Sequence, residues 1–479
     1  MKLAVVVQRY GLGVNGGAEL HARYVAERLA RHATVDVLTT CALDYVTWRN
    51  ELTKGTEEIN GLTVRRFLVS HEREPLRFAS RSERVFGETH SVADELQWLD
   101  AEGPSSPTLV SYISRHVADY DYWIFFSYRY YHAFHGARAA ARRAVLVPTA
   151  ERDPALGLSI FKPVFRGVRA LMYNSPEERA VIQALAGNHD VPSVVVGVGS
   201  DVPHNPQPKR FRHKFKIRGP FAIYVGRIDE NKGCRELFDA FGAYREAAAG
   251  QLSLVLVGNA LMSVPQSPHI RHLGFLNDAD KFDGMAAAEV LIMPSYFESL
   301  SMVALEAWAL GRPVLANARC DVLKGQCIRS NAGLYYGDTW EFIEALRAIE
   351  QNRWLSAGLG RNGRQFFRDH YDWSVIEGKY LDIFRRLSAE EPSRRSMDSL
   401  PGWLRRRRPD CTPGGEVVAG LPAGPILEAS PEPSSASLVS HPERRQRTGP
   451  ARSTERPQRR KSTQPPRRTG RQASKTRRT

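Results

Sequence analysis

Two glutamates, Glu298 and Glu306, have seven residues between them in the stretch PSYFESLSMVALEAWALGRPV at 294–314. The apolar run AEVLIM before this stretch has the length and composition of a strand. The segment VALEAWAL has apolar residues at helical spacing and stops at Gly311 and Pro313. Glu298 therefore belongs to a strand-to-helix loop and Glu306 to the helix. Such a pair could act as general acid and base, or as two contacts to one polar ligand.

The position of Ser301 favours the second interpretation. Ser301 is suited to cap the helix, so the helix N-terminus, with its free amides and positive dipole end, faces the carboxyl edge of the sheet, where a phosphate binds well. Glu306 follows five residues later, roughly 7 to 8 Å along the axis at 1.5 Å per residue. That separation is similar to the reach from a diphosphate to a ribose.

Two further loops supply groups for an anion. GRIDENKG at 226–233 follows a predicted strand and contributes Arg227 and Lys232, which could clamp a diphosphate. In GLGVNGG at 11–17, Gly16 and Gly17 allow backbone amides to approach an anion, although the spacing is not that of a dinucleotide fingerprint. Each motif alone also has a plainer interpretation. Glu306 could be a solvated helix residue, Glu298 could pair with an arginine, and Arg227 and Lys232 could pair with neighbouring acids.

The elements that position these residues form two α/β series. The first series opens with the predicted strand KLAVVVQ, a glycine loop, the helix AELHARYVAERLARH and the strand TVDVLTT. The second series opens with the predicted strand FAIYVG. We expect Rossmann-like domains at 1–203 and 217–370, a connection at 204–216 and a closing helix at 371–388. The region from about 75 to 118 is predicted to be mainly helical. In open α/β sheets, ligands bind beyond the carboxyl ends of the strands, where all these motifs lie.

Charge and cysteine content narrow the class of protein. Of the net charge of +15, twelve units come from residues 441–479. The basic segment 391–479 is predicted to be a disordered tail, either solvated without a partner or seated on an anionic membrane through Trp403 and Leu404. Nucleic acid is not favoured as a partner. The five scattered cysteines predict no disulfide framework or zinc site, and no apolar run is long enough to span a membrane. A cytoplasmic protein, soluble or peripheral to the membrane, is expected.

Four segments carry a resemblance when they are taken together: GGAE after the first strand, GRIDENKG, the E-x7-E stretch and the aromatic segment around Tyr371 and Trp373. They resemble the retaining nucleotide-sugar glycosyltransferases of the GT-B fold, family 4. The resemblance covers roughly residues 1 to 388. It implies that Arg227 and Lys232 hold the donor diphosphate, Glu298 contacts the transferred sugar and Glu306 binds the ribose. It further implies donor contacts from Gly16, Gly17, Gly258, Phe275, Ser299, Leu300, Ser301 and Met302.

On the acceptor side the chain departs from the family. His132 and His135 offer no clear match to the histidine that many members carry, and VPTAERDP replaces a His-Asp-Glu-like string. His132, Glu151 and Asp153 are therefore candidate acceptor contacts, with buried histidine and ordinary loop charges as the alternatives, and no catalytic base is assigned.

The expected reaction transfers a sugar from a UDP- or GDP-sugar to a polysaccharide, lipid-linked or glycolipid acceptor, with no metal or other cofactor. The alternatives are a nucleotide-sugar 2-epimerase of the same fold, or a non-enzymatic protein that binds anions or nucleic acid through its tail.

Overall fold

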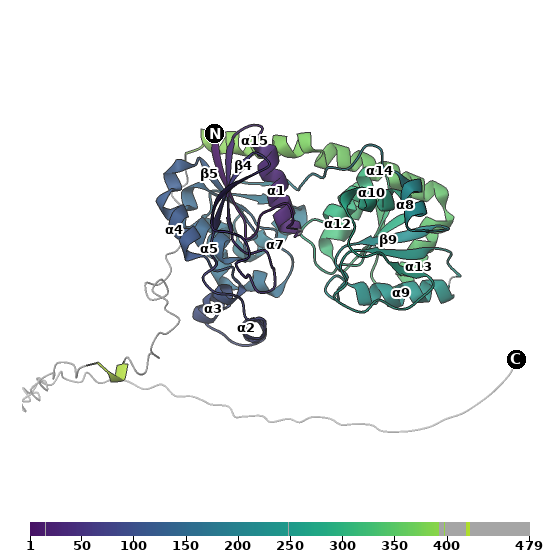
Figure 1. The fold of residues 1–479 in the computed structure, drawn as a ribbon, viewed down its shortest axis with the longest axis horizontal. Helices are drawn as coiled ribbons and strands as arrows, with labels where there is room; N and C mark the ends of the chain where they lie inside the picture. Colours follow the sequence, from purple (N-terminus) through teal and green to yellow (C-terminus); the bar gives the residue numbers. More distant parts are fainter. Residues whose placement is uncertain (15, 248, 392–396, 398–417, 422–479) are drawn as a thin grey trace, which may run out of the picture. The chain divides into compact units, whose positions relative to one another are not determined.

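The structure is a computed structural model that describes residues 1–14, 16–247, 249–391, 397 and 418–421. It contains a first domain built on an eight-stranded sheet and a second domain built on a six-stranded sheet (Figure 1). Both belong to the compact unit Met1–Arg406.

The first sheet has the strand order β3-β4-β2-β1-β5-β6-β7-β8, and every neighbouring pair is parallel except β3 with β4. Asn60 and Gly61, both with positive φ, form the two-residue turn of this antiparallel hairpin. The strands are β1 Lys2–Val6, β2 Thr34–Thr40, β3 Gly55–Ile59, β4 Leu62–Phe67, β5 Tyr122–Phe126, β6 Ala144–Val147, β7 Ala170–Tyr173 and β8 Ser193–Val195.

Alternation along the central strand β1 divides the core of this domain between two faces. Leu3, Val5 and Val7 pack with α1 (Gly17–Leu29) and α15 (Trp373–Ala389). Ala4 and Val6 belong to the cluster formed with helices on the other face. Those helices are α3 Val92–Glu102, α4 Pro107–Arg115, α5 Tyr131–Ala139, α6 Lys162–Gly167 and α7 Pro176–Ala186. Because β1 is buried on both sides, its sequence is apolar from Leu3 to Val6, as is typical of parallel strands.

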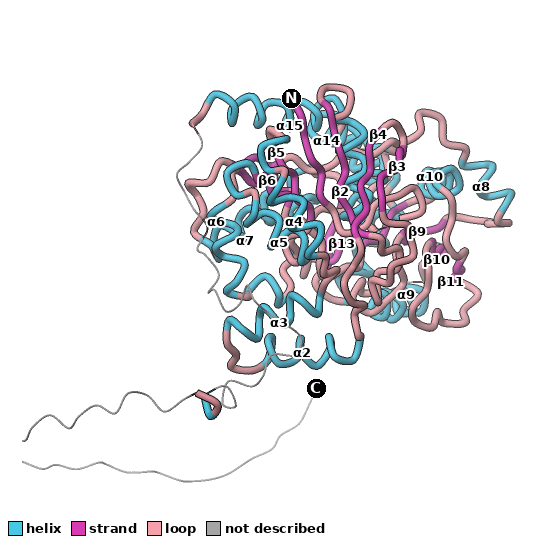
Figure 2. Tube along the Cα trace, turned by 60° about the vertical axis from the view of Figure 1, so that its left-hand side comes forward, coloured by secondary structure: helices cyan, strands magenta, loops and turns pink. Residues whose placement is uncertain are grey.

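The region 75–118 is helical, as predicted. It contains α2 (Pro75–Gly87), α3 and α4, and Figure 2 shows α2 and α3 side by side beyond the end of the first sheet. Ser91 caps α3 through a capping box with Asp94, which fixes where the second of these helices begins.

The second sheet is wholly parallel, with the order β11-β10-β9-β12-β13-β14. Its strands are β9 Phe221–Val225, β10 Ser253–Val257, β11 Ile270–His272, β12 Val290–Met293, β13 Val314–Asn317 and β14 Gly333–Tyr336. The helices are α9 Cys234–Ala247, α10 Asp278–Ala287, α11 Met302–Ala309, α12 Asp321–Ser330, α13 Thr339–Gln351 and α14 Arg353–Tyr371. Residues 371–388, predicted as the closing helix, correspond closely to α15.

The segment 204–216, expected to be an irregular connection, contains helix α8 (Pro208–Lys214). Phe211 of this helix is fully buried and stacks on Phe221 at the start of β9. Arg210 also pairs with Asp283 of α10 at 2.6 Å. The segment is therefore packed as part of the second domain. A single buried aromatic in seven residues is too short a pattern to predict a helix.

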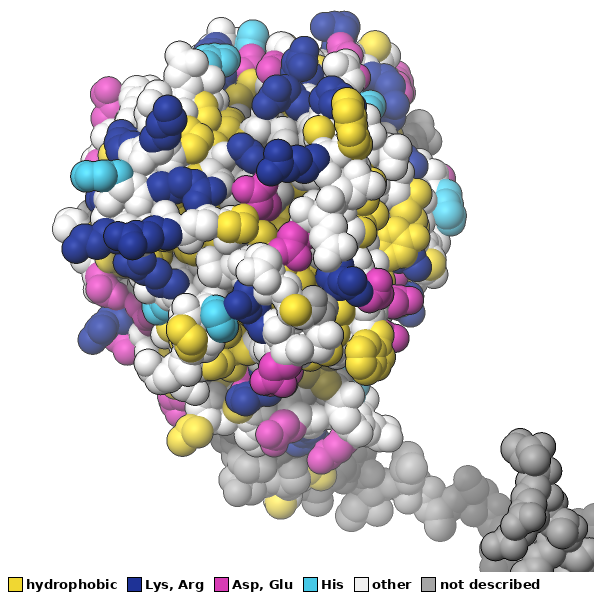
Figure 3. Space-filling view, turned by 90° about the vertical axis from the view of Figure 1, so that its right-hand side faces the viewer, with side chains coloured by type: hydrophobic (Ala, Val, Ile, Leu, Met, Phe, Trp, Pro, Cys, Tyr) yellow, Lys and Arg dark blue, Asp and Glu magenta, His cyan; other side chains and the backbone are white. Residues whose placement is uncertain are grey.

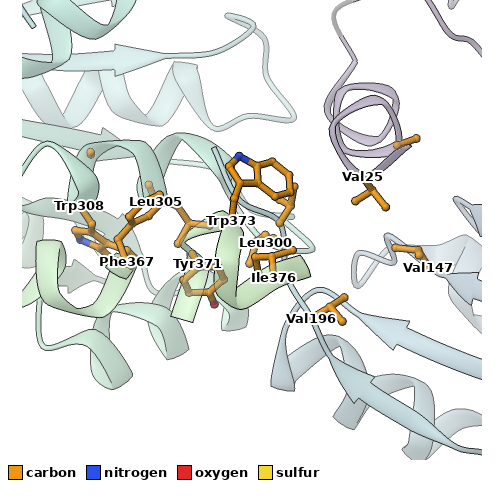
Figure 4. Packing of buried hydrophobic residues seen from close by; sticks show 14 of the residues in the cluster. Val25, Val147, Val196, Leu300, Leu305, Trp308, Phe367, Tyr371, Trp373 and Ile376 are labelled. Carbon is orange, nitrogen blue, oxygen red and sulfur yellow. The ribbon is translucent and has the colours of Figure 1, made fainter. Parts of the chain in front are cut away.

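The chain passes between the domains twice, through 196–203 and through 371–373, and the two passages touch. A Cβ atom at Gly199 would lie 2.6 Å from Cδ2 of Trp373, so only glycine allows this approach. Figure 4 shows Trp373 beside Leu300 and Ile376 within the buried cluster that also contains Val196. Beyond this point α15 packs on the first domain, where Phe384 stacks on Tyr122 and Arg169 donates to the Leu387 carbonyl at 2.8 Å.

The tail predicted at 391–479 falls almost entirely outside the described residues, so its disorder and its proposed membrane contact stay predictions. Within the described residues, no helix is both long enough and apolar enough to cross a membrane. Figure 3 views the molecule from the right-hand side of Figure 1 and shows Lys and Arg side chains spread over this face.

Candidate active site

The loop between β12 and α11 has the form that the sequence predicts. Ser301 caps α11, and its Oγ accepts a hydrogen bond from the Ala304 amide at 3.3 Å. Its φ of 103° is one that residues with a side chain rarely adopt, and such strain concentrates at functional sites. Among the described residues, no backbone hydrogen bond takes up the amides of 299–302. These amides and the helix dipole form a potential anion site.

Glu306 is buried, with 3% of the residue exposed, and is not a solvated helix residue. Its Oε1 accepts from Ser200 Oγ at 2.9 Å and from Lys281 Nζ at 3.2 Å. A carboxylate is expensive to bury without partners, so this position is specified by its surroundings.

Glu298 pairs with Lys232, the lysine of the GRIDENKG loop, whose Nζ lies 2.8 Å from Glu298 Oε1. Gly233 makes this approach possible: it has φ +72°, and a Cβ there would lie 2.1 Å from the Pro294 carbonyl oxygen. Burial opposes the charge on Lys232, but the neighbouring carboxylates Glu298 and Glu151 outweigh it and raise the pKa of the lysine. The two loops predicted to share one ligand are thus in direct contact.

Arg227 is held by Asp229 of its own loop, and its side chain is half exposed. The same aspartate accepts a hydrogen bond from the Lys232 amide at 2.8 Å. One carboxylate therefore holds both the side chain of Arg227 and the backbone of Lys232. The plainer interpretation of this loop, internal ion pairing, is therefore correct for Arg227. It does not exclude a diphosphate, because a half-exposed guanidinium still has free donors.

The glycine loop of the first domain leads into α1, with Gly16 as the N-cap and Gly17 as the first helical residue. Nearby, Arg9 Nε donates to Glu19 Oε1 at 2.8 Å, and both side chains are buried. An added Cβ at Gly17 would meet no atom within 4 Å. At Gly16, in contrast, an added Cβ would collide with the Glu19 carboxylate, so the open space at the start of α1 lies beside Gly17.

Glu151 is the acceptor-side candidate that the structure brings to the site. It lies in the loop after β6 and interacts electrostatically with both Lys232 and Glu298 of the second domain. Burial raises the pKa of Glu151 to about 7, opposed by the charge of Lys232 and reinforced by that of Glu298. The preceding amide, Ala150 N, donates to the buried carboxylate of Glu178 at 2.5 Å, which anchors the loop.

Asp153 is occupied within its own domain. Its Oδ2 accepts from Arg129 Nη1 at 2.6 Å, and its Oδ1 accepts from the Tyr128 hydroxyl at 3.2 Å and from the Leu156 amide at 3.1 Å. Arg129 in turn pairs with buried Glu102 at 2.8 Å. Asp153 thus acts as a helix cap and ion-pair partner, which agrees with an ordinary loop charge, and its role as an acceptor contact stays a prediction.

His132 also differs from the expectation. Its side chain is fully buried at the start of α5, and its Nε2 lies 3.2 Å from the Phe126 carbonyl oxygen. Burial lowers the pKa of His132 to about 3. A histidine enclosed in this way does not contact an acceptor, so the alternative of a buried helix histidine is correct.

The remaining donor-side candidates lie around the same edge of the second sheet. The Gly258 amide donates to the Gly274 carbonyl at 2.8 Å, and the neighbouring Phe275 is 60% exposed. Ser299 Oγ accepts from Asn174 Nδ2 of the first domain at 3.3 Å. Leu300 is buried and Met302 partly buried, so only their backbone atoms are suited to a polar ligand.

Two pockets lie near this edge. One of about 60 Å³ is lined by residues of both domains, including Arg152, Glu177, Glu298 and Asp321. A larger one of about 410 Å³ is lined by residues between Ala260 and His272, away from Lys232 and Glu298. We place the candidate site at the smaller one, because Glu298, the partner of Lys232, lines it.

Comparison with known proteins bears on this arrangement. Residues 219–352 match the family described as Glycosyl transferases group 1. The second domain is a group 1 glycosyltransferase domain.

Among curated relatives, the phosphatidyl-myo-inositol mannosyltransferase of Mycobacterium leprae is 29% identical over 180 residues, which is 36% of this chain and 47% of the relative. The D-inositol 3-phosphate glycosyltransferase of Jonesia denitrificans is 27% identical over 268 residues, 50% of this chain and 63% of the relative. The alignments thus span about half to two thirds of these relatives.

Solved structures extend the similarity to both domains. Sucrose-phosphate synthase from Thermosynechococcus elongatus has a TM-score of 0.59 at 18% identity and covers 81% of this chain and 99% of its own. Anabaena Alr3699/HepE in complex with UDP-glucose has a TM-score of 0.58 at 19% identity, covering 81% and 100%. At this identity the likeness concerns the fold. These structures confirm the predicted GT-B fold, and the match of residues 219–352 supports the predicted glycosyltransferase family.

Sequence reasoning missed several residues of this candidate site. Lys281 and Ser200 both contact Glu306, and Arg129 tethers the loop that carries Glu151. Neither Lys281 nor Ser200 belongs to a recognisable motif. The only available signal for Lys281 was its position on the helix that follows β11, at the edge where the other donor-side residues gather.

Proposed function

We propose that this protein is a retaining glycosyltransferase that moves a hexosyl group from a UDP- or GDP-sugar to a glycan, lipid-linked or glycolipid acceptor. The observation that carries the proposal is the contact between Lys232 and Glu298 at the start of α11, with Glu306 buried further along the same helix. The cation and the helix N-terminus suit the diphosphate of a donor. The two carboxylates, at this separation, suit the sugar and the ribose of the same donor.

In the proposed reaction, the bond between the sugar C1 and the diphosphate oxygen breaks while C1 bonds to an acceptor hydroxyl on the same face. The acceptor proton passes to the departing diphosphate. Lys232, Arg227 and the amides at 299–302 stabilise the negative charge that develops on the diphosphate, and they do so without a metal ion. Glu298 contacts the sugar, and Glu306 contacts the ribose.

Glu151 is proposed to orient the acceptor hydroxyl, because it reaches the Lys232 and Glu298 pair from the first domain. Two relatives are named for mannosyl transfer, the mycobacterial phosphatidyl-myo-inositol enzyme and the O-antigen chain mannosyltransferase B of Escherichia coli. These names support a lipid-linked acceptor and a mannosyl donor. We propose that the enzyme acts in the cytoplasm or at the inner membrane surface.

The test has two stages. Each common UDP- and GDP-sugar is first screened for thermal stabilisation of the full chain, since a ligand that binds only the folded state raises its apparent stability. The stabilising donor is then incubated with lipid-linked and free acceptors, with and without EDTA, and the product anomer is determined by NMR. Retained configuration is expected. An inverted product would refute the retaining mechanism, and epimerised free sugar without transfer would favour the 2-epimerase.

A further inference from the structure

The two carboxylate oxygens of Glu306 have different surroundings. Oε1 accepts two hydrogen bonds, from Ser200 Oγ at 2.9 Å and from Lys281 Nζ at 3.2 Å. Oε2 is buried and has no partner among the described residues. A buried acceptor without a hydrogen bond costs free energy, so such atoms in native proteins usually have a purpose. One oxygen is therefore committed to the protein, and the other retains its capacity for a ligand.

Lys281 is an unusual partner because it is largely buried, with 18% of its side chain exposed. Its ammonium also lies 3.3 Å from Asp278 Oδ1, at the exposed start of the same helix. Burial opposes its charge, but Glu306 and Asp278 outweigh burial and raise the pKa of Lys281. The lysine is therefore firmly charged and gives the buried carboxylate of Glu306 a charged partner.

Ser200 reaches Glu306 from the connection between the domains. The residues on either side of it are fixed, because Gly199 packs on Trp373 and Asp201 pairs with Arg28 of α1. Ser200 itself is 7% exposed. The orientation of the Glu306 carboxylate is thus set by a helix of the second domain and by a segment that belongs to neither sheet.

On the basis of the proposed function, we propose that Lys281 and Ser200 are positioning residues that hold Oε1 of Glu306, so that Oε2 alone accepts from one ribose hydroxyl of the donor. Because Oε2 is enclosed, the proposal requires neighbouring side chains to move aside when the donor binds. Tyr24 of α1 is one of these, since its hydroxyl interacts electrostatically with Lys281 and Glu306. A carboxylate that is fixed through one oxygen presents its other oxygen to the ribose from a single direction. The second oxygen therefore discriminates between the 2′ and 3′ hydroxyls.

The experiment measures binding of UDP and GDP, and of their 2′-deoxy and 3′-deoxy forms, to the full-length protein by calorimetry between pH 6 and pH 8.5. Wild type is expected to lose affinity for only one of the two deoxy forms. Lys281→Met should weaken binding by about tenfold or more at neutral pH, the size of one hydrogen bond to a charged group. Lys281→Arg keeps a cation beside Oε1 and should restore most of the affinity.

Ser200→Ala removes one hydrogen bond and no charge, so it tests the same proposal with little risk to folding. It should weaken binding of the diphosphates and reduce the preference between their deoxy forms. Lys214→Met is the matched control, because Lys214 pairs with a buried aspartate of the same helix, Asp280, at 2.6 Å without touching Glu306. This variant should bind as wild type does.

The outcomes separate this inference from the proposed function. If wild type binds neither UDP nor GDP, the proposed function fails. If wild type binds but Lys281→Met and Ser200→Ala bind equally well at every pH, the positioning role is overturned. Equal losses for both deoxy forms would overturn it as well. A loss on Lys281→Met that is confined to one nucleotide would also overturn it, by making Lys281 a contact to the base.

Discussion

Lys232 Nζ and Glu298 Oε1 lie 2.8 Å apart, so the cation assigned to the diphosphate and the carboxylate assigned to the sugar form one ion pair. The two groups come from loops that follow different strands, β9 and β12, which are neighbours in the second sheet. A donor that binds here shares the ammonium with Glu298 from the start. The positive charge is therefore already in position before charge develops on the leaving group.

Removal of the ammonium should impair the chemical step more than binding. Lys232→Ala is expected to lower turnover at saturating donor by about 10²- to 10³-fold, the usual loss for one preorganised electrostatic contact, with a smaller rise in KM. Steady-state kinetics with varied donor measure both quantities. Lys209→Ala, at an exposed lysine of α8, is the control and should behave as wild type. An unaltered rate at saturating donor would contradict the role of Lys232.

Glu306→Ala should weaken binding of the whole donor. Loss of a hydrogen bond to a charged group costs about 1.5–3 kcal/mol, which corresponds to roughly a 10- to 100-fold higher Kd. Calorimetry with the donor measures this change, and thermal unfolding reports the cost of leaving Lys281 without its buried partner. Glu344→Ala, at an exposed glutamate of α13, is the matched control. Donor affinity equal to that of wild type would eliminate the ribose contact.

Glu151 should make acceptor use dependent on pH. Because burial raises the pKa of Glu151 to about 7, its carboxylate form appears as pH rises through that value. We expect kcat/KM for the acceptor to increase between pH 6 and pH 8, and Glu151→Gln to be slower with a flattened profile. The raised pKa of Glu151 has the opposite effect on folding stability. Folding favours the protonated form of Glu151, so the contribution of this residue to stability is lost as pH rises through about 7. A wild-type profile that Glu151→Gln leaves unchanged would assign the titration to another group.

Gly233→Ala should separate backbone strain from steric contact. Gly219 has nearly the same conformation, with φ +75° against +72°, but a Cβ at Gly219 meets no atom, whereas one at Gly233 meets the Pro294 carbonyl. Gly219→Ala should cost about 1–2 kcal/mol of stability and leave activity intact. Gly233→Ala should cost more and reduce turnover, because the Lys232 loop is pushed away from Glu298. Denaturant unfolding and donor turnover of both variants test this, and equal behaviour would mean that the contact with Pro294 is unimportant.

Removal of residues 392–479 should leave donor binding and turnover of a soluble acceptor unchanged. The site residues all lie before position 307, and α15 ends at Ala389, where its last carbonyls are already bonded to Arg169. Any loss should be confined to association with anionic vesicles and should weaken with salt. Loss of donor turnover in the truncated chain would instead favour a protein that works through its tail.

The sequence predicts those parts of the fold whose signals are local. Buried strands such as β1 and β12 are continuous apolar runs, and the Ser301 cap is visible from its residue type and position. The β3–β4 hairpin was absent from the expectation although Asn60 and Gly61 carry a strong turn signal. Helix α8 was missed for a different reason, because the burial of Phe211 depends on α10 and β9.

The site was predictable wherever its residues follow strands, since parallel strands deliver their loops to one edge. Lys232, Glu298 and Glu151 meet for that reason. The partners of Glu306 were not predictable, because Ser200 and Lys281 reach it only once the connection and α10 have packed. The interior position of His132 was equally hidden, since its place at a helix start does not say which way the ring turns.

The double passage of the chain at 196–203 and 371–373 has a consequence for how the enzyme can come apart. A single proteolytic cut in either passage leaves the two domains joined through the other. Because the passages touch at Gly199 and Trp373, two segments of the chain join the domains at one place. A nicked enzyme should therefore migrate as two fragments on a denaturing gel and still elute as one particle under native conditions.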